Sequence, residues 1–184
     1  MKREVKNILD ELLSNGDLLP EDIPSLDLYM DQIITLFDSK FGNVDSDEKV
    51  ITKTMINNYS KAKMINPIKG KTYSKERIMQ ILMIYIMKNS LTMQQMKTVM
   101  QKMYEVEQIG EDGFVRAYRK YLAFKENEKE VFPALIDELL PSIDNDVGLE
   151  DVFVTLLCVC AMSEQLNSLA DQLVIKHFNV STEK

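Results

Sequence analysis

Few residues of this chain have the types and the spacing that enzymatic chemistry needs. The only cysteines are Cys158 and Cys160, and the only histidine is His177. On a helix, residues two positions apart point about 200° away from each other, so these two thiols cannot bridge each other. A zinc site needs about four Cys or His ligands, and these three residues leave one ligand missing and lack the usual spacing. We therefore expect buried thiols and no metal site.

Motifs for phosphate binding, calcium binding and nucleophilic catalysis are also incomplete. The GKT tripeptide at Gly70 resembles the end of a phosphate-binding loop, but Ile65 replaces the first glycine of that motif and Pro67 occupies the loop. The DNDVG stretch from Asp144 resembles a calcium loop, but it lacks the required Gly and the final Glu. No GxSxG motif occurs. The sequence predicts no enzyme activity and no cofactor.

Charge is strongly segregated along the chain, which has 184 residues and a net charge of −7. Residues 49–104 contain eleven Lys or Arg and a single acid, Glu76, whereas residues 1–48 and 105–184 carry net charges of −8 and −9. A basic block of this kind is often no more than a solvated surface. It is also what binding to a phosphate backbone requires, so the order of residues within the block matters.

A short polar-faced helix is expected inside the basic block, over residues 52–65. Thr52 is a residue type favoured as the N-cap, and Lys53 follows it. The apolar spacing assigns a buried face to Met55, Ile56, Tyr59 and Met64. The polar residues between them should face solvent or a ligand; they are Asn57, Asn58, Lys61 and Lys63.

The residues after this helix predict a basic hairpin followed by two packed helices. NPIKGKTYS has turn chemistry and is expected to form a small β-wing over residues 66–73, which carries Lys69, Lys71 and Tyr73. A helix capped by Ser74 and apolar around most of its circumference should be buried. Thr92 with Gln95 is a capping-box pattern that should begin the next helix.

The flanking segments are also predicted to be mainly helical. Apolar spacing predicts an amphipathic helix from Val5 to about Asn15, a connector over GDLLPEDIPS, and a helix capped by Ser25 that ends near Phe41. The Gly110 and Gly113 region marks a boundary. Two helices should follow, over 115–140 with a break near Phe132 and Pro133, and over 149–177.

No membrane association is expected from these patterns. The longest apolar run, residues 152–162, is shorter than the roughly 20 residues that a helix needs to cross a bilayer. The N-terminal MKREVKNILDELL has acidic residues and no unbroken apolar core, unlike a secretory signal. A cytoplasmic location is the resulting expectation.

The order of the basic elements resembles the MerR-type winged-helix family over about 60 residues. The resemblance is carried by TKTMINNYSKAKMI, NPIKGKTYS and the helix pair that follows. It implies that Thr52 starts the DNA-reading helix, that 57–59 replace the family's Arg-Tyr-Tyr run, and that Lys71 and Tyr73 replace its wing Arg and Tyr. Thr92 takes the cap of the next helix. The chain departs from the family at Asn57, which replaces an Arg, and in the long acidic loop 42–49.

Residues 18–130 are also similar to the YkrK-like family of bacterial proteins of unknown function, found mostly in Firmicutes. This similarity rests on LPEDIPSLDLYMDQI and ITKTMINNYSKAKM, and it implies a regulator-like role. The expected fold is mainly α, a MerR-like winged helix-turn-helix with a small β-wing and a C-terminal helical domain. Its expected parts are residues 1–26 (helix and connector), 27–108 (winged-helix module) and 109–184 (helical dimerisation or regulatory domain).

Two functions from different classes fit these features. The first is a transcriptional regulator that reads double-stranded DNA with the 52–65 helix and the 66–73 wing, and forms a homodimer through its C-terminal helices. Asn can pair with adenine edges, and Lys with guanine or phosphate. The second is a non-enzymatic helical adaptor that uses the same module to bind an acidic protein. Salt dependence separates the two, because only binding to DNA releases condensed counterions in proportion to the phosphates contacted.

Overall fold

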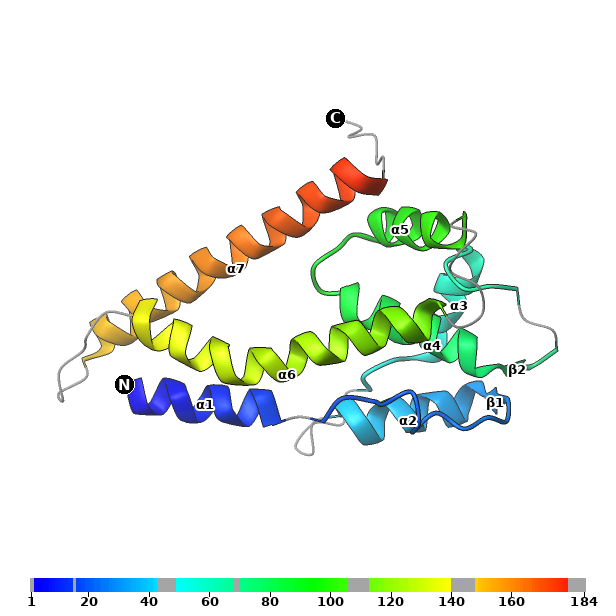
Figure 1. The fold of residues 1–184 in the computed structure, drawn as a ribbon, viewed down its shortest axis with the longest axis horizontal. Coiled ribbons are helices and arrows are strands. Elements are labelled where there is room, and N and C mark those ends of the chain that lie inside the picture. Colours follow the sequence, from blue (N-terminus) through cyan, green and yellow to red (C-terminus); the bar gives the residue numbers. More distant parts are fainter. Residues whose placement is uncertain are drawn as a thin grey trace. The chain divides into compact units, whose positions relative to one another are not determined.

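Helices dominate the structure, a computed structural model that describes residues 2–14, 16–42, 49–67, 70–105, 113–139 and 148–178 (Figure 1). The prediction of a mainly α protein is confirmed. In chain order the elements are α1 (Lys2–Ser14), β1 (Leu28–Tyr29), α2 (Met30–Phe41), α3 (Lys53–Lys61), β2 (Thr72–Tyr73), α4 (Lys75–Met87), α5 (Met93–Glu105), α6 (Gly113–Leu139) and α7 (Leu149–Phe178).

The chain divides into two compact units. The core unit contains residues 16–119 and 170–184, and the flanking unit contains residues 1–15 and 120–169. Both α6 and α7 therefore contribute residues to each unit.

The core unit is built around α4, which is buried as the sequence predicts. Ile78, Met79, Ile81, Leu82 and Ile84 of this helix are inaccessible to solvent. Apolar side chains of α2 and α3 are buried in the same unit, among them Ile33, Phe37, Ile56 and Tyr59. The core therefore holds α2 and α3, the two helices that precede the predicted wing, by their apolar faces.

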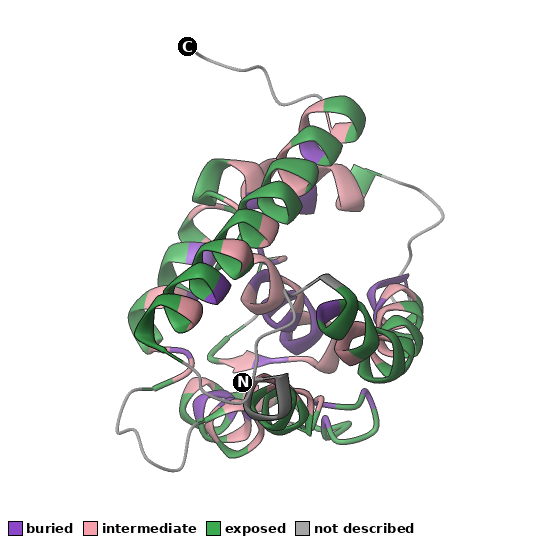
Figure 2. Ribbon diagram, turned by 90° about the vertical axis from the view of Figure 1, so that its left-hand side faces the viewer, coloured by how far each residue is buried: buried purple, intermediate pink, exposed green. Residues whose placement is uncertain are grey.

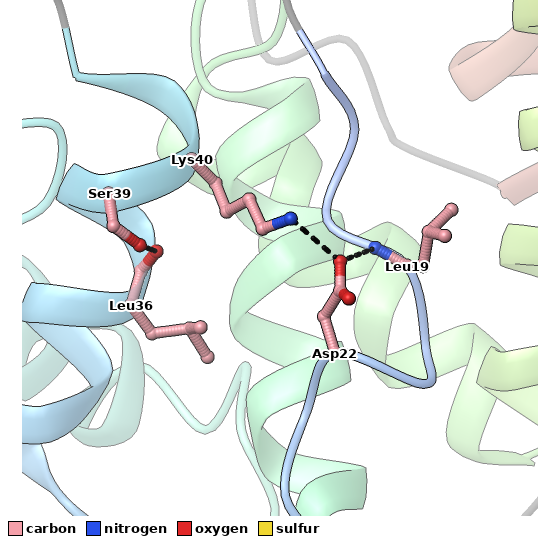
Figure 3. A network of polar contacts seen from close by, with 5 residues as sticks. All are labelled: Leu19, Asp22, Leu36, Ser39 and Lys40. Atoms are coloured by element: carbon pink, nitrogen blue, oxygen red, sulfur yellow. Dashed lines mark hydrogen bonds and ion pairs between the residues drawn. The ribbon is translucent and has the colours of Figure 1, made fainter.

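The segment before α2 is part of this core and is more than a connector, because Leu18 and Ile23 are buried. Figure 3 shows how the segment is held on α2: the Asp22 carboxylate accepts a hydrogen bond from the Leu19 backbone at 3.1 Å and lies 2.9 Å from Lys40 Nζ. The hydrogen bond from Lys40 and, after it, the hydrogen bond from the Leu19 backbone hold the pKa of Asp22 below its ordinary value.

The start of α2 differs from the prediction that Ser25 caps it. The helix begins at Met30, and the Gln32 side chain accepts a hydrogen bond from the Tyr29 backbone N–H at 2.8 Å. Residues 28 and 29 are extended instead, because they form β1 and pair with β2. Ser25 is a residue type that favours an N-cap position, but α2 does not begin there.

The strand in the predicted wing has a different partner from the one expected. β2 pairs antiparallel with β1, in the register Leu28 with Tyr73 and Tyr29 with Thr72. Thr72 Oγ1 also donates a hydrogen bond of 3.4 Å to Asp27. Among the residues described in 66–73, no second strand pairs with β2, and residues 68 and 69 lie outside the description. The local hairpin prediction was wrong because pairing with a distant strand supplies the backbone partners.

Two further predictions concern α6 and its boundaries. The expected break near Phe132 and Pro133 is absent, because α6 continues through Pro133. A proline removes one backbone hydrogen bond and crowds the preceding turn, which distorts a helix without necessarily ending it. Gly113 is the first residue of α6, whereas Gly110 lies outside the described residues.

The long final helix is confirmed as α7, but its two thiols are not buried as predicted, because Cys158 is half-buried and Cys160 is exposed. Figure 2 shows it, as the helix that leads to the C-terminus, exposed along most of its length. Among the described residues, it is the one helix whose length and apolar composition suffice to cross a membrane, with a mean hydropathy of 1.5 over 18 residues. Core helices of soluble proteins have the same length and composition, so these two properties alone do not assign a membrane span.

Candidate nucleic-acid interface

The predicted polar face is presented by α3. Thr54, Asn57, Asn58 and Lys61 of this helix are exposed, at the spacing that places side chains on one face. Ile56 and Tyr59 are buried on the other face. Thr52 is the N-cap, as predicted, and its Oγ1 accepts a hydrogen bond of 3.2 Å from the Met55 backbone. An amphipathic helix with amide and ammonium groups toward solvent has the chemistry to contact base edges.

The helix is shorter than the predicted 52–65 span. It ends at Lys61, because Lys63 adopts a left-handed conformation with φ of 59°. The backbone N–H of Met64 then donates to the Tyr59 carbonyl at 3.0 Å, which closes the C-terminal turn. Lys63 is exposed, and Met64 is buried as predicted.

One cation of the predicted set already has an acidic partner. Lys53 Nζ lies 2.6 Å from an Asp31 carboxylate oxygen at the start of α2, and both side chains are mostly exposed. An exposed pair of this kind is worth about 0.2–1 kcal/mol. A phosphate that competes with Asp31 for Lys53 therefore has only a small penalty to overcome.

The segment that leads into α3 is held by α2 and by Lys88, the C-cap residue of α4. The Val50 backbone N–H donates to Asp38 of α2 at 3.0 Å, and the Val50 carbonyl accepts from Lys88 Nζ at 3.0 Å. Lys88 also lies 4.6 Å from the centre of the Tyr85 ring. The acidic loop residues Asp45, Asp47 and Glu48 lie outside the described residues.

Tyr73 is buried, although the resemblance to winged-helix proteins placed it among the wing contacts. Only 2% of its surface is exposed. Burial raises the pKa of Tyr73, and a hydrogen bond between its side chain and Ser60 of α3 partly offsets that rise. Tyr73 is therefore part of the core, and the exposed Lys71 precedes it by two positions.

A buried amide in α4 holds the chain between α3 and β2. Gln80 is inaccessible to solvent, and its Oε1 accepts a hydrogen bond of 2.9 Å from the Asn66 backbone N–H. Gln80 Nε2 and Asn66 Nδ2 each donate to Glu76 Oε1 at 3.1 Å. The one acid of the basic block is thus engaged inside the core unit.

Two further side chains fix the backbone of the same segment. Arg77 Nε donates to the Pro67 carbonyl at 3.1 Å, and its Nη1 donates to the Ser74 hydroxyl at 3.0 Å. Tyr104 of α5 donates its hydroxyl proton to the Met64 carbonyl at 2.7 Å. Burial, reinforced by the negative charge of Glu76, raises the pKa of Tyr104, which therefore stays a donor at neutral pH.

Sequence reasoning missed the four residues whose side chains bind the segment between α3 and β2: Glu76, Arg77, Gln80 and Tyr104. One signal was present, because Gln80 is an amide within an otherwise apolar helix, and a buried amide must find hydrogen-bond partners. The structure thus assembles Thr52, Lys53, Asn57, Asn58, Lys61, Lys63 and Lys71 in the core unit, leaves Lys69 outside the described residues, and buries Tyr73.

The helix start after this site matches its prediction. The Thr92 backbone N–H donates to Gln95 Oε1 at 2.8 Å, and the Gln95 backbone N–H donates to Thr92 Oγ1 at 3.3 Å, which is the predicted capping box. No group of three His, Cys, Asp or Glu side chains within the described ranges is arranged to hold a metal ion.

The core unit is thus a helical domain with a two-stranded ribbon and an exposed polar helix. Its limits agree with a comparison to known families: residues 18–121 match the domain of unknown function DUF1836, and the chain belongs to this family. The match begins at Leu18, the first buried residue of the core unit among those described. No curated protein and no solved structure matches the chain.

Proposed function

We propose that the core unit binds duplex DNA and that the protein is a transcriptional regulator. In this proposal α3 enters the major groove, with Asn57, Asn58 and Lys61 near base edges. Lys53, Lys69 and Lys71 lie on phosphates. Tyr73 is left out of the contact set, because its burial makes it part of the core.

The observation that carries this proposal is the exposed polar face of α3, which lies in the same compact unit as the exposed Lys71. A base-reading face and a phosphate-binding segment are then parts of one packed element, with Gln80 and Arg77 holding the chain between them. The helix order around α3 also supports a MerR-like helix-turn-helix, in which β1 supplies the strand partner of the basic segment.

The rest of the proposal concerns the regions outside the core unit. We propose that the acidic C-terminal part mediates homodimerisation and that the protein acts in the cytoplasm without an enzymatic activity. Net charges of −8 and −9 on the flanks would repel DNA, so they favour contact through the 49–104 block alone.

The test is a salt titration of fluorescence anisotropy, with random duplex DNA and with the DNA upstream of the protein's own gene. Contact with about four to six phosphates should give a slope of log affinity against log salt near −4 to −5. A variant with Lys61→Glu and Lys71→Glu should lose binding to both duplexes. Its matched control, Lys120→Glu with Lys176→Glu, makes the same charge change at exposed positions of α6 and α7.

Each outcome has a defined meaning. Loss of binding in the first variant, with binding kept in the control, supports the α3 and wing contacts. Equal loss in both variants would mean that net charge alone governs binding. Absence of binding at about 50 mM salt, where the electrostatic attraction is strong, would overturn the proposal in favour of the adaptor.

A further inference from the structure

The flanking unit has almost no hydrophobic core of its own. Among its described residues, only Ile136 and Thr155 are buried. Large apolar side chains of α1 and α6 in this unit are exposed, among them Leu12, Phe124 and Val131. A unit that buries so little apolar surface lacks the main contribution to folding stability.

The exposed apolar side chains of this unit are densest on α7. Leu149, Val152, Leu156, Val159 and Leu166 are each at least 43% exposed, and we call these five residues the apolar stripe. Their spacings of three, four, three and seven residues give a repeat of seven, with Ser163 at the remaining stripe position. A seven-residue repeat aligns side chains along one seam of a helix, which is the pattern of helices that pack lengthwise on one another.

The exposed apolar surface of the stripe is a large part of what a protein interface needs. The five stripe side chains are exposed by 43% to 86% of their surface. A full Val or Leu side chain presents on the order of 100 Å² of apolar surface, so these five expose roughly 290 Å². A standard interface buries about 800 Å² on each partner, of which about 60% is apolar.

We propose that a second copy of this chain covers the apolar stripe of α7. Every copy carries the same stripe, so a two-fold axis lets each stripe cover the other and leaves no further stripe open. This inference deepens the dimer part of the proposed function by naming its surface, and it does not depend on DNA binding.

The chemistry of α7 favours a second copy over a lipid bilayer. Residues 163–168, with the sequence SEQLNS, place five polar side chains directly after the apolar run 152–162. By length and composition α7 is sufficient to cross a membrane, but these polar side chains near its middle would then lie in the hydrocarbon, where burying them is costly. Farther along α7, Asp171 accepts a hydrogen bond of 2.8 Å from Gln95 of α5, which ties this end of the helix to the core unit. The acidic flanks would also be repelled by anionic lipid.

The test compares the mass of the full chain in solution with that of stripe variants, without DNA. Sedimentation equilibrium should give the wild type twice the 21.3 kDa of one chain. Leu156→Glu with Val159→Glu should raise the dissociation constant of the dimer by on the order of 100-fold, because it places four carboxylates in the interface. The control is Leu19→Glu with Leu26→Glu, the same change at two exposed leucines of the core unit, and it should remain dimeric.

A milder variant keeps the test decisive if the charged one fails to fold. Leu156→Ala should fold, as judged by circular dichroism, and should weaken the dimer by about 10-fold or more. A wild type that stays monomeric at about 50 µM, well within the range of a stable dimer, would overturn the inference. A dimer that the stripe variants leave unchanged would also overturn it. Flotation of a monomeric wild type with phosphatidylcholine vesicles would assign the stripe to lipid instead.

The inference and the DNA-binding proposal fail separately. A dimer without DNA binding would leave the stripe assignment intact and remove only the regulator. DNA binding by a monomer would leave the DNA-binding proposal intact and remove only the assignment of the stripe to a second copy.

Discussion

The buried side-chain amide of Gln80 holds the backbone of Asn66, with 2.9 Å between the Gln80 Oε1 and the Asn66 nitrogen. Gln80 lies on α4, the most buried helix of the core unit, and Asn66 lies in the chain that leads from α3 to β2. The position of the segment that carries Lys71 therefore depends on a residue that contributes nothing to the exposed surface.

Replacing Gln80 by Met should destabilise the core unit. The substitution keeps the volume but leaves the Asn66 N–H without its acceptor, which costs about 1–3 kcal/mol for a buried donor. Urea denaturation of the full chain measures the loss. The control is Gln94→Met, the same change at an exposed position of α5, which should alter stability by less than about 0.5 kcal/mol. Equal effects of the two changes would contradict the role assigned to Gln80.

Removing the cap of α3 should have a smaller effect on stability. Thr52→Ala deletes the hydroxyl that accepts the Met55 N–H, at an expected cost of about 0.5–2 kcal/mol. Thr54→Ala is the matched control, because Thr54 is exposed inside the first turn of the same helix. Thermal melting of both variants is the measurement, and a melting temperature of the Thr52 variant at or above that of the control would sink the capping assignment.

The two faces of α3 should separate stability from DNA recognition. Asn58→Ala on the exposed face should leave the unfolding free energy within about 0.5 kcal/mol of wild type, yet reduce discrimination between specific and random duplex by about 1–3 kcal/mol. Ile56→Ala on the buried face should cost about 2–5 kcal/mol of stability. Competition binding and urea denaturation of both variants check this division. An Asn58 variant with unchanged sequence preference would remove Asn58 from the reading face.

The ion pair of Asp22 should make stability depend on acid pH. Its pKa is lowered in the folded protein, first by the hydrogen bond with Lys40 and then by the Leu19 backbone N–H. A carboxyl with a depressed folded pKa contributes stability above its unfolded pKa of about 3.9, and loses it as pH falls through the folded pKa. Asp22→Asn should therefore be less stable than wild type at pH 7, and the difference should shrink as the pH falls below about 4.

Urea midpoints at pH 7 and at pH 3 measure this effect. Glu130→Gln, a change of the same kind at an exposed position of α6, serves as the control. A difference between wild type and the Asp22 variant that stays constant with pH would show that the carboxylate charge plays no part.

Local features of the fold were predictable because they depend on neighbouring residues. Apolar periodicity predicted the seven helices of the described ranges. The cap at Thr52 was predicted from its residue type, and the cap at Thr92 from its spacing to Gln95. The burial of α4 followed from apolar residues around most of its circumference. The same reasoning put the end of α3 too late, because the left-handed Lys63 that closes the helix has no strong local signal.

Features that depend on distant parts of the chain were not predictable. The pairing of Tyr29 with Thr72 joins positions 43 residues apart in the sequence, and it displaced both the predicted hairpin and the predicted cap at Ser25. Leu18 and Ile23 read as part of a turn-rich connector, yet the core buries them. Tertiary contacts override local preference in such places because their burial and pairing outweigh small differences in propensity.

The sequence by itself determined the helical class of this protein, the charge of its central block and the residue types on the polar face of α3, since all three follow from composition and from a period of 3.6 residues. Only the tertiary structure decided that Tyr73 belongs to the core, that Gln80 and Arg77 hold the segment behind Lys71, and that the apolar stripe of α7 is left open. The physical reason is that burial and hydrogen-bond partners are properties of the packed chain, and residues far apart in sequence supply them.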